Sequence, residues 1–380
     1  MVKKKMIEDF FELISDSFTF YKNGVLYDKV LKTFYKELKG IKNKKIKLKK
    51  TEFNSDSLSE SHFVSKKAKN ALKKIKYGYT TKLSVLNAEV ELCFLTSKNT
   101  SHKEQVENAK RVYKLVMFLM GFSNMNLETI KITLFLHDDN KKIKKKYEIL
   151  SPKHVNTAVT YACAKNGEIF LYRKEEWFKV LAHELMHSLC LDFSGLGTKS
   201  LKDNCKKLFK IKSDYEISES YAEYWATIIN ILFLSFDISN SYKPFKENVT
   251  MMLDFEKIFS LYQCTKILKY MGISNYSTLL QSQSQLYEEK TNVFAYYFIK
   301  TVLLYDYEEF MQFCYSNNPP ANPISFYKSP GNLNTFFNYI LKHYNSDDLR
   351  GDFDTMEKIF DNVNGNDLKY TMRMTLFEKN

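Results

Sequence analysis

The sequence predicts an α+β protein in which a small mixed sheet is followed by a mainly helical C-terminal half. Two patterns support this prediction: apolar residues alternate as in strands between residues 80 and 173, and they recur at helical spacing after residue 213. The scarcity of Gly (11) and Pro (6) among 380 residues also favours long regular elements. Hydrophobic residues make up 44% of the chain, which is enough for a sizeable core.

The predicted elements fall into three regions, residues 1–79, 80–212 and 213–380. The first region is basic and helical. The first 80 residues of the chain hold 20 Lys and no Arg against 9 acidic residues, which accounts for +11 of the net charge of +13. We expect helices within residues 3–39 with a break near Asn23-Gly24, a polar linker over 54–61 and an amphipathic helix within 63–76.

The second region combines strands with helices. We expect, in chain order, one or two strands within residues 83–95, a helix over 104–120, a strand over 129–137, a hairpin and a helix over 174–189. The hairpin would pair residues 155–163 with 168–173 around Lys165-Asn166-Gly167, because Asn-Gly is a strong hairpin signal. The third region is expected to hold helices over residues 214–236, 243–271, 277–304 and 307–314 and two shorter ones after Pro330.

The expected compartment is the cytoplasm. No apolar stretch reaches the roughly 18–20 residues that a membrane span needs, and Glu8, Asp9 and Glu12 interrupt any N-terminal signal sequence. Because no CxxC pair is present, the cysteines are expected to be reduced thiols. They are Cys93, Cys163, Cys190, Cys205, Cys264 and Cys314.

One motif carries chemistry, His183-Glu184-Leu185-Met186-His187. Two His four residues apart lie on one helix face, so both imidazoles can bind a single Zn²⁺, and the Glu between them can act as a general base on water. From the composition, a chance HExxH has a probability on the order of 1%. The alternative is a helix with two satisfied core histidines and a surface Glu.

A third ligand is needed for a catalytic zinc site. The metzincin continuation HExxHxxGxxH fails, because Cys190 and Phe193 stand at the Gly and His positions and Asp192 is out of phase. The segment Glu219-Ser220-Tyr221-Ala222-Glu223, 32 residues after His187 in an apolar helix, instead resembles the ExxxE of the gluzincin metallopeptidases.

By this resemblance Glu219 is the third zinc ligand and Glu223 orients a ligand histidine. Glu216 is the rival ligand, although Ser213 with Glu216 also fits a capping box at the start of that helix. The resemblance further implies a zincin-like catalytic domain with a backing helix, a HExxH helix and an edge strand that pairs with substrate. It also implies an oxyanion-stabilising residue, for which Tyr296 is the candidate and Tyr297 and Tyr221 are alternatives.

Residues 150–230 also resemble uncharacterised HExxH proteins of large DNA viruses. This resemblance implies a viral protein, leaves association with the virion open and implies no particular substrate. The expected function is that of a zinc metallopeptidase acting on a peptide or protein, which the basic region suggests is acidic. Two alternatives stay open: a non-catalytic structural protein with a zincin fold, and a basic protein that holds nucleic acid through residues 40–76. The absence of Arg in the basic region weakens the second alternative.

Overall fold

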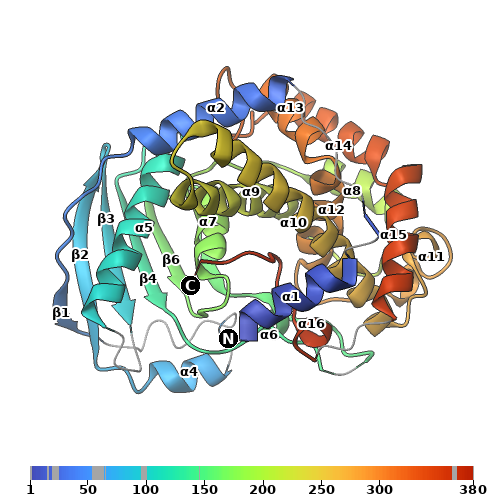
Figure 1. Ribbon diagram of the computed structural model, residues 1–380, viewed down its shortest axis with the longest axis horizontal. Helices are drawn as coiled ribbons and strands as arrows, with labels where there is room; N and C mark the ends of the chain where they lie inside the picture. Colours follow the sequence, from blue (N-terminus) through green and yellow to red (C-terminus); the bar gives the residue numbers. More distant parts are fainter. Residues whose placement is uncertain are drawn as a thin grey trace.

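The computed structural model describes residues 2–14, 17–18, 25–53, 64, 66–95, 101–144, 146–361 and 366–379. The expected linker at 54–61 and Phe63 lie outside the described residues. The described chain is a mixed α/β protein in which an open sheet lies on one side and helices make up the rest (Figure 1). None of the described helices combines the length and the apolar character that a membrane crossing requires.

The sheet has six strands in the order β1-β2-β3-β4-β6-β5. Their bounds are Lys49–Glu52 (β1), Tyr77–Val85 (β2), Ala88–Leu95 (β3), Thr129–Phe135 (β4), Ala158–Thr160 (β5) and Asn166–Leu171 (β6). Strands β3, β4 and β6 are parallel, and the outer strands on both sides run antiparallel to their neighbours. Leu92, Ile132 and Ile169 stand in register across the three parallel strands and are fully buried, which fits the apolar runs expected of central strands.

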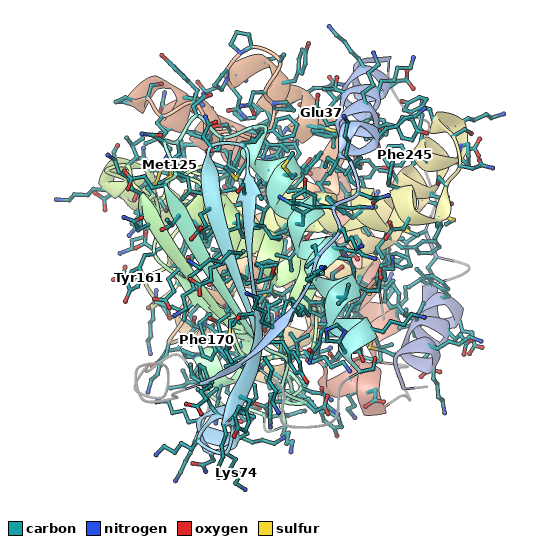
Figure 2. All side chains as sticks on the ribbon, turned by 90° about the vertical axis from the view of Figure 1, so that its left-hand side faces the viewer. Glu37, Lys74, Met125, Tyr161, Phe170 and Phe245 are labelled. Carbon is teal, nitrogen blue, oxygen red and sulfur yellow. A yellow bond between two sulfur atoms is a disulfide. The ribbon has the colours of Figure 1, made fainter. Side chains whose placement is uncertain are left out.

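Two layers of side chains cover the two faces of the sheet. Leu83, Val90 and Leu92 belong to the main core, which lies under α5 (His102–Met120) and α7 (Trp177–Ser188). Cys93 and Leu95 alternate with them and pack in a smaller cluster with α4 (Lys66–Leu72) on the other face. Figure 2 looks from the side of the sheet, with Lys74 beyond the end of α4 and Tyr161 on the turn that joins β5 to β6.

The helical half is built around α9, whose first two turns carry Glu219 and Glu223. It packs against α7, α10 and α12 and also against α2 from the N-terminal region. The remaining helices have the bounds Val2–Ile14 (α1), Val25–Gly40 (α2), Pro152–Val155 (α6), Lys199–Leu208 (α8), Ser218–Ile238 (α9), Tyr242–Met271 (α10), Tyr276–Leu280 (α11), Lys300–Tyr305 (α12), Tyr307–Asn317 (α13), Pro330–His343 (α14), Asp347–Phe360 (α15) and Asn366–Tyr370 (α16).

The N-terminal helices are part of the same core. Phe34 of α2 makes edge-to-face contacts with Phe118 of α5 and Trp225 of α9. Helix α1 lies against α16 near the other end of the chain (Figure 1). Apolar packing is therefore continuous from the basic N-terminal region to the helical half.

Three local predictions are wrong. Asn166 and Gly167 do not form the hairpin turn but begin β6, where they pair with Thr129 and Ile130 of β4. Ser213 does not cap α9, since its hydroxyl bonds the backbone of Glu289 and the helix begins only at Ser218. The expected helix over 277–304 is broken into α11, a short 3₁₀ turn, a π-helix over Phe294–Ile299 and α12.

Candidate metal centre

Helix α7 carries the HExxH residues through the centre of the molecule. All twelve of its side chains are buried, between β5 and β6 on one side and α9 on the other. Gly167 of β6 allows this close approach, because a Cβ there would lie 2.8 Å from the Ser188 hydroxyl oxygen. The residue before the helix, Glu176, has a left-handed backbone (φ 60°), and its carboxylate accepts hydrogen bonds from the backbone N–H groups of Met374 and Thr375.

Three side chains converge from α7 and α9. The Nε2 atoms of His183 and His187 lie 3.1 Å apart, and Glu219 Oε2 lies 3.1 Å from each of them. The possible ligand atoms of these residues all lie within 4.8 Å of one another, which is the spacing of a metal site. Among the described residues, no other such group of three His, Cys, Asp or Glu is found.

Carboxylates behind the two imidazoles orient them. Asp192 Oδ2 lies 2.6 Å from His187 Nδ1, and Glu223 Oε2 lies 3.0 Å from His183 Nδ1, although without the alignment of a formed hydrogen bond. A proton held on His187 Nδ1 in this way leaves its Nε2 lone pair facing Glu219, and His183 Nε2 faces the same carboxylate. Two nitrogen lone pairs and one carboxylate oxygen aimed at one point fit a divalent cation.

The charges of the site agree with this fit. Burial lowers the pKa of His183 to about 4, so its imidazole is neutral at pH 7. Burial also disfavours charge on His187, but the carboxylates of Asp192 and Glu219 raise the pKa of His187 well above its ordinary value. A cation entering the site would therefore displace a proton, as is usual for metal binding to histidine.

Glu184 stands beside the cluster and lines the same cleft. Burial raises the pKa of Glu184 to about 7. The cleft has a volume of about 330 Å³ and runs along the free edge of the sheet, where Ala158, Val159 and Thr160 of β5 form one wall. β5 is the edge strand and β6 lies inside the sheet, so of the two hairpin strands only β5 offers its backbone to a ligand.

Of the three tyrosine candidates for the oxyanion-stabilising role, the structure brings one into the cleft. Tyr296 lines the cleft, and its ring centroid lies 5.8 Å from that of His183. Tyr297 points away and donates a hydrogen bond to the carbonyl oxygen of Met372, and Tyr221 donates to the carbonyl oxygen of Ile324. Tyr296 is carried by the π-helix, an element that is frequent at functional sites.

Glu216, the rival ligand, lies outside the cluster. It is paired with Lys202 of α8, and the cluster is completed by Glu219 instead. The two glutamates lie only three residues apart, so the spacing in the sequence left both open.

Three residues near the site were not expected from the sequence. Asp192 was set aside as out of phase for a ligand, yet its place behind His187 follows from a left-handed backbone at Cys190 (φ 57°) that turns the chain back. Asn292 donates to Glu219 Oε1 at 3.3 Å, and Lys179 contacts the Glu223 carboxylate one turn before His183. A buried acid shortly after the HExxH, as at Asp192, is the signal that the sequence offered.

The prediction of six reduced thiols is wrong for Cys163 and Cys190, which form a disulfide. Cys93, Cys205, Cys264 and Cys314 are free. The disulfide ties the β5–β6 turn to the residue three positions after His187, and the backbone N–H of Cys163 also donates to the His187 carbonyl oxygen at 3.1 Å. The wall of the cleft is therefore fixed to the helix that carries the metal ligands.

In comparisons with known proteins, the chain matches no protein-family model, no curated protein and no solved structure. The case for its function therefore depends on the site itself.

Proposed function

We propose that this chain is a zinc-dependent peptidase of the gluzincin type, with a zincin-like catalytic domain. The single observation that carries the proposal is the convergence of His183 Nε2, His187 Nε2 and Glu219 Oε2 beside Glu184, in a cleft bounded by a sheet edge. Three residues from two helices, each in the position that the HExxH…ExxxE pattern assigns to it, are unlikely to meet by chance.

The donor set favours zinc among the common divalent cations. Zn²⁺ prefers imidazole and carboxylate ligands in tetrahedral geometry, whereas Mg²⁺ and Ca²⁺ prefer oxygen ligands. Three protein ligands leave the fourth position open, which distinguishes a catalytic zinc site from a structural one. A zinc ion held by these residues would lower the pKa of a water molecule and polarise the scissile carbonyl.

Residues of the chain would bind the substrate, transfer the proton and stabilise the developing negative charge. The backbone of β5 would pair with an extended substrate and place its scissile bond over the cluster. Glu184 would accept the proton of the attacking water and pass it to the leaving amine. The Tyr296 hydroxyl, in the same cleft as Glu184, would donate a hydrogen bond to the substrate carbonyl oxygen as negative charge develops on it.

The test combines metal analysis with hydrolysis of a mixed peptide library by the full chain. We expect one zinc ion per chain, retained in Glu184→Gln but lost in Glu219→Ala, and peptide cleavage lost in both variants. Glu216→Ala is the matched control for metal binding, because Glu216 lies three residues from Glu219 and is paired with Lys202 instead; it should keep the zinc ion.

Two results would contradict the proposal. A purified protein that is stable and holds no zinc when supplied with it would rule out the metal site. Full peptidase activity in Glu184→Gln would rule out the role of Glu184. Stoichiometric zinc without cleavage of any peptide would instead favour the non-catalytic alternative.

A further inference from the structure

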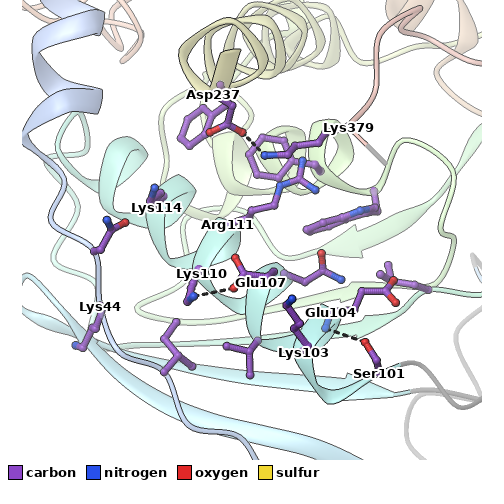
Figure 3. A pocket seen from close by; sticks show the side chains of 18 of the residues that line it. Lys44, Ser101, Lys103, Glu104, Glu107, Lys110, Arg111, Lys114, Asp237 and Lys379 are labelled. Carbon is purple, nitrogen blue, oxygen red and sulfur yellow. Dashed lines mark hydrogen bonds and ion pairs between the residues drawn. The ribbon is translucent and has the colours of Figure 1, made fainter. Parts of the chain in front are cut away.

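A second, larger hollow lies outside the metal cleft and shares no lining residue with it. This α5 groove is bounded by the first turns of α5, residues 43–46, the start of α7, the end of α9 and residues 378–379 (Figure 3). Its volume is about 1160 Å³, above the roughly 300–1,000 Å³ of pockets that enclose a small molecule. The size therefore favours an extended chain as its occupant.

The groove is lined by charges of both signs, with cations in excess. Four of its residues are acidic and eight are basic, which gives a net charge of +4. The acidic residues are Glu104, Glu107, Asp237 and Glu378, and the basic ones are Lys44, Lys45, Lys103, Lys110, Arg111, Lys114, Lys174 and Lys379. Two of the lysines are already paired, Lys110 with Glu107 and Lys379 with Asp237. The net positive charge of the groove therefore comes mainly from the six cations outside these two pairs.

Arg111 occupies the middle of the groove (Figure 3). Its guanidinium lies 4.6 Å from the ring centroid of Phe178 and 5.1 Å from that of Trp177. Among the described residues, no carboxylate is found in an ion pair with Arg111, although Asp237 and Glu378 act on its charge from farther away. A guanidinium held in place against two aromatic rings is a preorganised receptor for a carboxylate.

The rest of the lining distinguishes between two kinds of anionic partner. Four carboxylates among the cations would repel a continuous phosphate backbone. Trp177 and Phe178 are buried (4% and 2% exposed) under Arg111, so neither can stack on a base. Leu136, Phe233 and Leu234 add apolar surface, which suits a peptide with both acidic and apolar side chains.

We propose that the α5 groove is an exosite that binds an acidic segment of a polypeptide, with Arg111 as its carboxylate receptor. The role as a substrate exosite rests on the proposed peptidase function, whereas binding of the acidic peptide does not. Trp177 in the groove and His183 in the metal site are six residues apart on α7, a rise of about 9 Å. A substrate anchored in the groove would thus be held close to the cleft and would gain effective concentration there.

The test measures binding of a fluorescein-labelled 12-residue peptide of alternating Glu and Leu to the full chain by fluorescence anisotropy. Its Gln-Leu analogue is the uncharged probe. We expect the acidic peptide to bind and the analogue to bind at least tenfold more weakly. Arg111→Gln and the double variant Lys103→Gln/Lys114→Gln should each weaken binding of the acidic peptide about tenfold or more. The matched control Lys73→Gln/Lys74→Gln, with exposed lysines next to α4 on the other face of the sheet, should change it less than twofold.

Several results would overturn the proposal. Unchanged binding in both groove variants would place the peptide elsewhere, and the lysine pair keeps this outcome informative if Arg111→Gln does not fold. Binding of single-stranded DNA that is as tight and as sensitive to the same variants would make the groove a nucleic-acid site. The assay is repeated with Glu184→Gln and with chelator-treated protein, so a failed metal site and a failed groove are distinguishable. With an active enzyme, Arg111→Gln should raise KM for an acidic substrate while kcat stays unchanged.

Discussion

Glu223 is expected to have two separable roles, one in stability and one in metal binding. It lies on α9, only 2% of its side chain is exposed, and it contacts both the Lys179 ammonium and the edge of the His183 ring. Replacing it by Gln keeps its volume but removes its charge. Lys179 would then be left in the core, 1% exposed, without the carboxylate that it contacts.

The size of the stability effect follows from Lys179. Burial lowers the pKa of Lys179 well below its ordinary value of 10.5 even with Glu223 beside it. Removing that carboxylate should lower this pKa further, so in the variant the amine releases its proton on folding. Neutralising such an amine at pH 7 costs at most about 4.8 kcal/mol, which agrees with the roughly 3–5 kcal/mol lost when one partner of a buried pair is removed. For 380 residues this corresponds to a fall in Tm of about 4–6 °C.

The direction in which the stability of Glu223→Gln changes with pH follows from the protonation of Lys179. In Glu223→Gln the unfolded chain binds one more proton at Lys179 than the folded chain does, so the stability of the variant rises with pH. Between pH 7 and pH 9 the deficit relative to the wild type should shrink by up to about 2.7 kcal/mol. Differential scanning calorimetry of the wild type and the variant at both pH values measures this change in the deficit.

A second variant separates the two roles. Adding Lys179→Met to Glu223→Gln removes the stranded amine and should restore most of the lost stability. Zinc affinity, measured by competition with a chelator, should stay about 10–100-fold below that of the wild type in both variants, because His183 has lost its carboxylate. The reasoning is refuted if the double variant is no more stable than Glu223→Gln, or if zinc affinity recovers together with stability.

Three further predictions concern single contacts. Asp192→Asn should weaken zinc binding about 10–100-fold, because His187 loses the carboxylate at 2.6 Å, while the surface control Asp203→Asn should not; equal affinities in the two would contradict this role. Cys163→Ser opens a disulfide that spans 27 residues, so it should cost about 3.5 kcal/mol, or roughly 4 °C in Tm. A reducing agent should lower the Tm of the wild type by the same amount and leave the variant unchanged, and a wild type insensitive to reduction would exclude the bond. Burial raises the pKa of Glu289 to about 8 from 4.5, so its contribution to stability is full below pH 4.5 and is lost as pH rises to about 8. Glu289→Gln should therefore raise Tm at pH 8 and change it little at pH 4.5, and a variant with the pH slope of the wild type would show that Glu289 is not its source.

The sequence predicted best those features that depend on neighbours along one element. The spacing of His183 and His187 fixes them on one face of α7, and the apolar periodicity predicted α5, α10 and most of the strands. Glu219 was predicted as a metal ligand from its resemblance to the HExxH…ExxxE pattern and not from geometry. A separation of 32 residues says nothing about distance until α9 is packed against α7.

The failures occurred where tertiary contacts override a local signal. Asn166-Gly167 has the composition of a turn, but Asn166 accepts a hydrogen bond from the Thr129 hydroxyl, and Gly167 is needed where β6 meets α7. Ser213 and Glu216 have the spacing of a capping box, but each has a stronger partner outside the helix, Glu289 and Lys202 respectively. A window of sequence cannot contain these partners.

The α5 groove was beyond prediction for the same reason, since six separate segments line it. The basic composition of residues 1–80 suggested an acidic partner, yet only Lys44 and Lys45 of that region line the groove. The remaining cations come from α5, from Lys174 just before α7 and from Lys379. The arginine at its centre, Arg111, lies outside the region whose lack of Arg had argued against a specific site.

The charges around α7 argue for a function beyond stability. Buried ionisable groups are costly, and a helix that served only to fill a core would be more stable with apolar residues at their positions. Here His183 and His187 face a cleft, each with a carboxylate behind it, and Glu184 is buried beside them. A helix that only filled the core would have no need of that arrangement, which is why we favour a catalytic metal site over a structural protein that happens to carry the motif.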